Sequence, residues 1–153
     1  MVLKAAPETP WSAAMLGQIV KESTDIPAGV FNVLTAEDPV SLGEQLVKDP
    51  RVDMISFTGS TVVGKRVMAL ASESVKKVFL ELGGKSANII LEDSDLSQSL
   101  LSSLAVCFHA GQGCAIHTRL LIPKSRRDEI ESLLQTYFGY IEYGDPMSET
   151  QIM

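Results

Sequence analysis

Cysteine, histidine and aromatic residues are scarce in this 153-residue chain, and positive charge is outnumbered by negative charge. Two cysteines, Cys107 and Cys114, are too few for a disulfide framework. The 13 Lys and Arg residues are scattered and face 19 Asp and Glu residues, which gives a net charge of −6. This balance argues against a nucleic-acid-binding surface, which needs clustered positive charge.

Long apolar runs are absent as well. No stretch reaches the roughly 18 apolar residues of a membrane span, and the start, Met1 to Lys4, lacks the layout of a signal peptide. We therefore expect no membrane partner and a cytoplasmic protein. Cys107, His109, Cys114 and His117 have a spacing that matches no zinc pattern, so the rival interpretation of these residues as a metal site is set aside.

Strand and helix signals alternate along the chain, and 45% of its residues are hydrophobic. Helices are expected after Thr9-Pro10, Asp38-Pro39, Ser60 and Asp95. Three β-α-β crossovers in succession predict an α/β fold with a parallel, Rossmann-like sheet. The expected strands are residues 2–4, 30–34, 52–57, 75–82, 87–91 and 118–122.

Two helices have clear apolar faces. Trp11, Met15 and Ile19 share one face of the first helix and are expected in the core. The last helix is strongly amphipathic, and the residues 125–128 before it resemble a capping box. Gly83-Gly84 is the best internal boundary.

A carboxylate stands where a strand meets a glycine turn, in the run Leu80-Glu81-Leu82-Gly83-Gly84-Lys85. In an α/β sheet, ligands bind beyond the carboxyl ends of the strands, so Glu81 is placed to act on a bound group. The alternative is a solvated residue at a strand end, which is common.

A cysteine follows 33 residues later inside the glycine-spaced turn Gly111-Gln112-Gly113-Cys114. Free backbone N–H groups in such a turn can meet a developing oxyanion, and an exposed thiolate is a nucleophile. The alternative is a small core residue, as most lone cysteines are.

Together these two runs resemble the two signatures of the aldehyde dehydrogenase superfamily. The resemblance implies that Glu81 is the general base and Cys114 the catalytic thiol. It covers nearly the whole chain but only the central segment of a family member. Residues 1–82 would be the C-terminal half of a dinucleotide-binding domain, and residues 83–153 the N-terminal part of the thiol catalytic domain.

A cofactor site is expected where Phe57-Thr58-Gly59-Ser60 leads into a helix N-terminus, because unpaired N–H groups there stabilise a pyrophosphate. As a bare glycine spacing, Gly59 to Gly64 is a weak signal. The resemblance adds that Gly59, Ser60 and Gly64 lie against the dinucleotide, that Lys4 reaches the adenosine ribose, and that Leu82 contacts the nicotinamide end. Alternatively, Lys4 is an ordinary surface lysine.

The choice between NAD and NADP stays open. NAD-preferring relatives often carry a carboxylate three residues after the lysine, where it repels a 2′-phosphate, and this chain has Pro7 there. Two positions depart from the cysteine signature: Cys107 replaces an aromatic or aliphatic residue, and Ile116 replaces a small one.

The implied activity is oxidation of a small-molecule aldehyde to a carboxylic acid through a thioester on Cys114, which Glu81 hydrolyses with water. An unpaired sheet edge beside Val2-Leu3-Lys4 and uncovered helix faces would favour a homo-oligomer or a complementing chain. The alternative is a non-catalytic remnant that binds nucleotide or a partner chain. The aldehyde itself cannot be identified from these residues.

Overall fold

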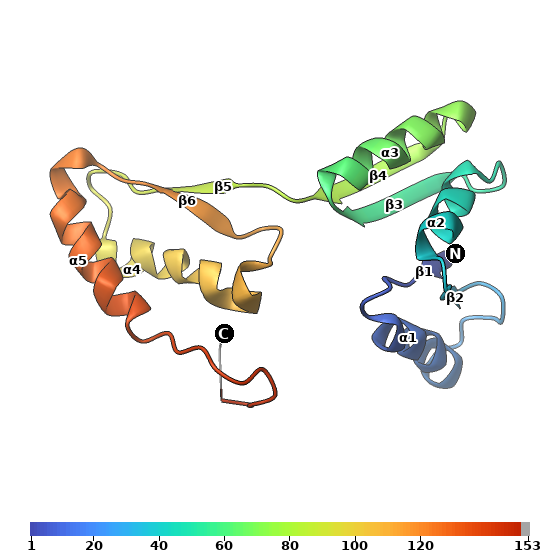
Figure 1. Ribbon diagram of the computed structural model, residues 1–153, viewed down its shortest axis with the longest axis horizontal. Helices are drawn as coiled ribbons and strands as arrows, with labels where there is room; N and C mark the ends of the chain where they lie inside the picture. The colour runs from blue at the N-terminus through green and yellow to red at the C-terminus, as the bar shows by residue number, and fades with distance from the viewer. Residues whose placement is uncertain (151–153) are drawn as a thin grey trace. The chain divides into compact units, whose positions relative to one another are not determined.

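The computed structural model describes residues 1–150 and divides the chain into two compact units. Met1–Glu81 forms the first unit, and the residues from Leu82 onward form the second. The division lies one residue before the predicted boundary between residues 82 and 83. That these units are parts of a nucleotide domain and a thiol domain stays a prediction. Figure 1 shows helices beside short strand pairs in each unit.

The first unit alternates strands and helices, as the sequence predicts. Its elements are β1 (Val2–Lys4), α1 (Pro10–Ser23), β2 (Asn32–Leu34), α2 (Pro39–Lys48), β3 (Met54–Gly59), α3 (Thr61–Ala71), a short 3-10 turn η1 (Ser72–Ser74) and β4 (Lys77–Leu82). The fourth strand begins two residues later than expected because Val75 takes a left-handed conformation with φ of 52°. The α/β fold class is therefore confirmed.

The strands pair two by two rather than in one continuous sheet. β1 and β2 are parallel, with Leu3 opposite Val33, and β3 pairs with β4. Within residues 1–150 no hydrogen-bond ladder joins the two pairs, so β1 and β3 each use one edge only. The predicted sheet is present as separate halves.

Side-chain caps fix where two of these helices start. Asp38 accepts hydrogen bonds from the backbone N–H groups of Val40 and Ser41, both at 3.1 Å. Ser60 accepts one from Val63 N–H at 3.3 Å. Thr9 makes no side-chain cap bond, and α1 begins with Pro10, whose missing N–H needs no partner.

The core of the first unit lies between α2, α3 and the β3–β4 pair. Buried Val47, Val67, Leu70 and Ala71 pack against half-buried residues of the two strands: Ile55, Phe57, Val78 and Leu80. The expectation that the face of α1 is core is wrong. Trp11 is 85% exposed, and Met15 and Ile19 are about half exposed, because nothing in residues 1–150 covers that face.

The second unit packs helices against one parallel strand pair, β5 (Ser86–Ile89) and β6 (His117–Leu121). Between them, Asp95 caps a single turn, α4 (Leu96–Ser99), by accepting from Ser97 N–H at 2.9 Å. The rest of the expected helix is a 3-10 segment, η2 (Leu100–Gly111). A short turn, η3 (Lys124–Arg126), leads into α5 (Arg127–Phe138), and residues 139–150 follow without a helix or strand.

The apolar face of α5 is confirmed as core. Ile130 is fully buried with Leu100, Ile90 and Leu96, and Leu133, Leu134 and Tyr137 pack against them. Phe138 at the end of the helix stays 36% exposed.

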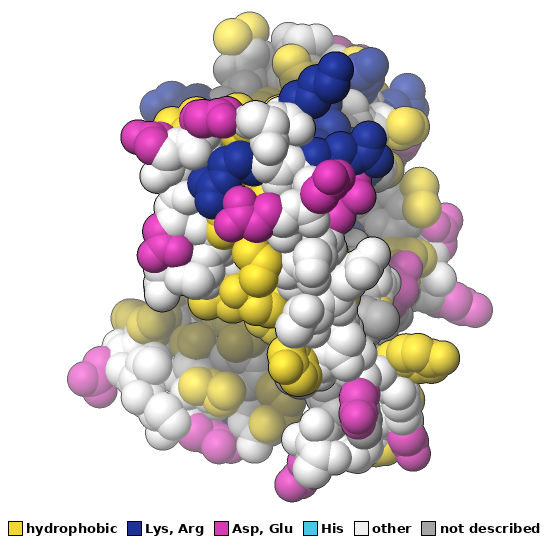
Figure 2. Space-filling view, turned by 90° about the vertical axis from the view of Figure 1, so that its left-hand side faces the viewer, with side chains coloured by type: hydrophobic (Ala, Val, Ile, Leu, Met, Phe, Trp, Pro, Cys, Tyr) yellow, Lys and Arg dark blue, Asp and Glu magenta, His cyan; other side chains and the backbone are white. Residues whose placement is uncertain are grey.

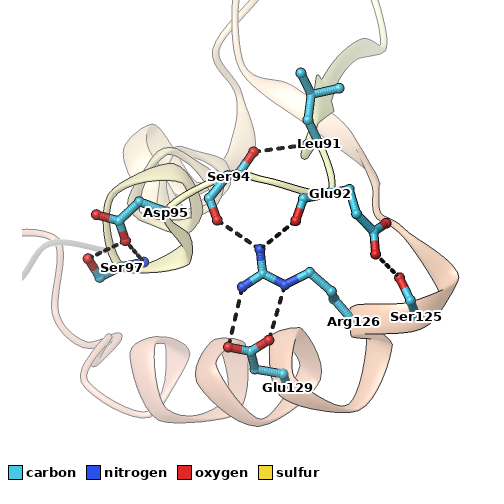
Figure 3. A network of polar contacts seen from close by, with 8 residues as sticks. All are labelled: Leu91, Glu92, Ser94, Asp95, Ser97, Ser125, Arg126 and Glu129. Atoms are coloured by element: carbon cyan, nitrogen blue, oxygen red, sulfur yellow. Dashed lines mark hydrogen bonds and ion pairs between the residues drawn. The ribbon is translucent and has the colours of Figure 1, made fainter.

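Arg126 ties the loop after β5 to the start of α5 (Figure 3). Its Nη1 donates to the carbonyls of Glu92 and Ser94, at 3.1 and 2.8 Å, while its Nε donates to Glu129 at 3.1 Å. Ser125 donates its hydroxyl to the Glu92 carboxylate and does not cap α5. The expected capping box is therefore wrong: η3 turns Ser125 toward the neighbouring loop before the helix begins.

Many apolar side chains reach the surface. Figure 2 shows hydrophobic side chains on the visible face, near a part where basic and acidic side chains lie together. In the first unit, the exposed apolar side chains include Val2, Met54 and Phe79, which are 46%, 55% and 62% exposed. No helix within residues 1–150 has the length and apolarity needed to cross a lipid bilayer.

Candidate functional site

Lys4 is the last residue of β1, and its side chain runs under α2. It is half-buried, and its Nζ donates to the Ala5 carbonyl at 2.5 Å. A Cβ added at Gly43 of α2 would lie 3.7 Å from Lys4 Cδ, so the helix passes close above the lysine stem. Lys4 is therefore a positioned residue at a strand end, unlike a freely solvated surface lysine.

Gly59 ends β3 in a place where only a glycine fits. An added Cβ would lie 2.5 Å from Cζ of Phe57 and 3.1 Å from its Cε1. Carbon atoms normally meet at about 3.5–4.0 Å, and the Phe57 ring is held in the core cluster. The missing side chain leaves bare backbone at the exit of the strand.

The N-terminus of α3 follows directly. Ser60 caps the helix by accepting from Val63 N–H, and Gly64 donates its N–H to the Ser60 carbonyl at 2.9 Å. Among the residues described, the N–H groups of Thr61 and Val62 have no protein partner, and the first turn carries no acidic side chain. This end of the helix can therefore accept an anion.

Glu81 and Leu82 are the last two residues of β4, which ends next to a glycine, whereas β3 ends on one. Glu81 is exposed and Leu82 is half-buried, in keeping with the alternation along the strand. The two following glycines have nothing within 4 Å of an added Cβ. Glu81 is thus open to solvent and free of ion pairs among the residues described.

Cys114 lies in a turn that a left-handed segment introduces. His109, Ala110 and Gly111 have φ values of 51°, 52° and 77°, so the 3-10 segment stops there. Gln112 closes the turn, because its backbone N–H and its side-chain amide both donate to the His109 carbonyl at 3.1 Å. The Cys114 thiol is free and exposed.

The neighbours of Cys114 distinguish it from the other thiol. Ile116 packs over Gly113, where an added Cβ would lie 2.9 Å from Ile116 Cγ2, so the bulky residue noted in the sequence does press on the turn. The second cysteine, Cys107, is buried with 8% of its surface exposed. Exposure thus favours Cys114 as the reactive thiol.

The structure groups the predicted residues by unit. Lys4, Gly59, Ser60 and Gly64 all belong to the first unit, where Glu81 is the last residue, and Cys114 belongs to the second. The sequence reasoning missed Gly43 as the neighbour of Lys4. A glycine inside a helix pattern was the signal, since it often marks a close approach.

Two surface hollows of the first unit lie away from these residues. One, of about 260 Å³, is apolar and lies beside α1 and the loop before β2; it is lined by Met1, Leu16, Val20, Ile26, Val30 and Phe31. The other lies at the C-terminal part of α2 and is lined by Ser41, Glu44, Gln45, Lys48, Asp49 and Pro50. Neither includes a residue of the predicted site.

Comparison with known proteins gives a consistent result over the whole chain. The sequence model of the aldehyde dehydrogenase family matches residues 1–153. A 3-succinoylsemialdehyde-pyridine dehydrogenase from a Pseudomonas species is 44% identical over 99% of this chain and 32% of its own length.

Solved structures agree with this match. An NADP-dependent enzyme from E. coli superposes with a TM-score of 0.92 at 36% identity, over 100% of this chain and 32% of that one. A cysteine-to-alanine mutant of aldehyde dehydrogenase C from Pseudomonas syringae, in complex with NAD+ and octanal, gives 0.90 at 37% identity, over 99% of this chain and 31% of that one. The chain thus spans about a third of the length of the relatives that it matches.

Proposed function

The chain belongs to the aldehyde dehydrogenase family, and from that premise we propose that it oxidises an aldehyde to a carboxylic acid with NAD or NADP. Two observations support the proposal: Glu81 is the penultimate residue of β4, just before two glycines, and Cys114 is an exposed thiol in a glycine-spaced turn. The proposed setting is the cytoplasm.

Cys114 is the nucleophile in this proposal. Its thiolate forms the S–C bond to the aldehyde carbonyl carbon, and the oxygen gains the negative charge. The Cys114 backbone N–H, which has no protein partner among the residues described, is a donor for that oxyanion. When the carbon loses its hydride, a thioester remains on Cys114.

Glu81 completes the cycle as a general base. It takes a proton from water, the hydroxide forms a bond to the thioester carbonyl, and the C–S bond breaks to return the thiolate. Its exposure and its freedom from ion pairs leave the carboxylate available for this proton.

The residues at the end of β3 fit a dinucleotide. The bare backbone at Gly59 and the open N–H groups of Thr61 and Val62 offer a cradle for a pyrophosphate. Ser60 and Gly64 build this turn, Lys4 would hold the adenosine ribose, and Leu82 would contact the nicotinamide end. The bound nicotinamide would supply the hydride acceptor.

The test is production of NADH or NADPH from a simple aldehyde, with a Cys114→Ala control. The proposal expects cysteine-dependent turnover, and Glu81→Gln should release about one NADH per chain and then stall, because the thioester is no longer hydrolysed. Full turnover by Cys114→Ala would contradict the mechanism.

A second candidate is a non-catalytic remnant that binds nucleotide or a partner chain. The observation in its favour is the uncovered apolar face of α1, together with coverage of only a third of each relative. A folded sample that binds NAD or NADP but gives no cysteine-dependent product would support this candidate. Either function is compatible with a homo-oligomer or a complementing chain.

A further inference from the structure

A stripe of buried side chains runs along α4 and η2. Leu96, Leu100, Ser103 and Cys107 are each 8% exposed or less, and they follow one another at intervals of four, three and four residues. The hydrogen bonds of η2 are of the 3-10 type, but these intervals are those of one face of an α-helix. Leu96 and Leu100 pack in the core with Ile130 of α5, so this face of the segment is the buried one.

The same spacing, continued along the chain, leads to Cys114. Position 114 is seven residues after Cys107 and 18 residues after Leu96, close to two and five full turns of a helix with 3.6 residues per turn. A helix that continued past Phe108 would therefore place the Cys114 thiol on the buried face. The structure shows the opposite, because Cys107 is buried and Cys114 is exposed. The chain must change direction between the two cysteines.

This change of direction occurs in residues 108–111. Phe108 is extended, with ψ of 142°, and His109, Ala110 and Gly111 are left-handed, with φ of 51°, 52° and 77°. Glycine adopts this conformation freely, whereas an L-residue with a Cβ atom does so at a cost, because Cβ approaches the following carbonyl oxygen. His109 and Ala110 therefore hold a strained conformation, which persists only if another contact stabilises it.

Gln112 provides that contact. Its backbone N–H and its side-chain Nε2 both donate to the His109 carbonyl, each at 3.1 Å. The backbone bond spans three residues, as in any 3-10 turn, so it does not depend on which residue stands at position 112. The side-chain bond requires an amide donor at the end of a side chain of this length. It joins the residue that follows the left-handed segment to the residue that begins it.

We propose that Gln112 is a positioning residue for Cys114. Its side-chain amide stabilises the left-handed segment, and this segment turns the thiol from the buried face of η2 to the surface. The backbone N–H groups of Gly113 and Cys114 have no protein partner within residues 1–150, whereas a continuing helix would use both. The inference rests on the proposed function, because Gln112 acts there through the proposed nucleophile and its oxyanion donor.

The test is the rate at which iodoacetamide alkylates Cys114 near neutral pH, without aldehyde or nucleotide, with Cys107 as the internal reference. Gln112→Met keeps the side-chain length and removes the donor. We expect alkylation of Cys114 to become at least about fivefold slower, because loss of one hydrogen bond shifts the population toward the helical continuation that buries the thiol. Gln135→Met is the matched control on the exposed surface of α5 and should leave the rate unchanged.

A second substitution tests whether the strain is the reason that Gln112 is needed. Ala110→Gly removes the Cβ atom that makes the left-handed conformation costly. Combined with Gln112→Met, it should restore the alkylation rate to within about twofold of the unmodified chain. A general loss of stability would not be rescued at this exposed position. The urea unfolding midpoint and the alkylation rate of Cys107 should stay unchanged in each of these variants.

Two further measurements make the test independent of one variant. In Gln112→Met, the amides of Gly113 and Cys114 should exchange hydrogen more slowly, by about the same factor as the alkylation, because helical hydrogen bonds now protect them. Ala110→Val keeps Gln112 but adds a β-branched side chain, which opposes the left-handed conformation, so it should also slow alkylation of Cys114. If Gln112→Met fails to fold, the result for Ala110→Val decides.

Three results would overturn the inference: unchanged or faster alkylation of Cys114 in Gln112→Met, an equal decrease in Gln135→Met, or no rescue by Ala110→Gly. The expected pattern in a chain that shows no aldehyde turnover would support the inference and count against the proposed function. Cysteine-dependent turnover together with unchanged alkylation in Gln112→Met would count against the inference alone.

Discussion

Replacing Gly59 by alanine tests whether the exit of β3 is built around a missing side chain. The new Cβ would stand 2.5 Å from Cζ of Phe57, about 1 Å inside the normal separation of two carbon atoms. The Phe57 ring is packed with Val47, Val67 and Leu70, so it cannot rotate away without disturbing that cluster. Overpacking of this kind costs about 1–3 kcal/mol of unfolding free energy.

The measurement is urea unfolding followed by circular dichroism, with Gly83→Ala as the matched control. Nothing lies within 4 Å of a Cβ at Gly83, so that variant should change the unfolding free energy by less than about 0.5 kcal/mol. Phe57→Leu shortens the side chain that clashes. In the double variant with Gly59→Ala, the two effects should be less than additive by about 1–2 kcal/mol.

A Gly59→Ala chain as stable as the unmodified one would refute the steric argument. Additive effects in the double variant would show that the cost comes from another source, such as the backbone. If stability falls as expected but NAD or NADP binding is unchanged, the bare backbone serves packing alone, and the proposed cradle loses its main support.

Two further outcomes follow from the second unit. Arg126→Gln should lower the unfolding free energy by about 1–3 kcal/mol, because two backbone carbonyls lose a charged donor. Arg127→Gln removes only an exposed ion pair and should lower it by less than about 0.5 kcal/mol. Equal effects of the two variants in urea unfolding would contradict this ranking. Hydrogen bonds from the Ser97 hydroxyl and N–H lower the pKa of Asp95 below its usual 3.8. The ionised Asp95 carboxylate therefore stabilises the folded state fully above pH 3.8, and this stabilisation is lost as the pH falls through the lowered pKa of the folded state. In the Asp95→Asn variant, the unfolding midpoint should therefore fall less steeply as the pH is lowered in the acid range. An unchanged pH dependence would show that other carboxylates cause the loss of stability in acid.

Local rules predicted what local contacts decide. The caps Asp38, Ser60 and Asp95 work as the sequence indicates, because each needs only N–H groups two or three residues away. The apolar stripe of α5 is correct for a similar reason, since the spacing of Ile130 and its neighbours selects one face of a helix. The strand ends at Lys4 and Leu82 also lie where the pattern places them, whereas β3 starts and ends two residues later than expected and includes Gly59.

Longer-range competition explains the errors. Ser125 was expected to cap α5, but the Glu92 carboxylate, 33 residues earlier, takes its hydroxyl, and no local rule contains that partner. The helix expected after Asp95 is α-helical for one turn only and continues as a 3-10 segment, which His109 and Ala110 interrupt with left-handed conformations. The exposure of Trp11 depends on what covers α1, which periodicity along one helix cannot predict.

The alternation of hydrogen bonds along β1 fixes the length of this strand to the residue. The backbone groups of Met1 and Ala5 bond to β2, so the odd-numbered positions face β2 and the even-numbered positions face the unpaired edge of the strand. One inserted or deleted residue would exchange these two sets and turn the Lys4 side chain to the other face. An insertion within β1 should therefore be tolerated less well than the same insertion in a loop of this unit, such as the loop after Ala5 or the loop after Ser23.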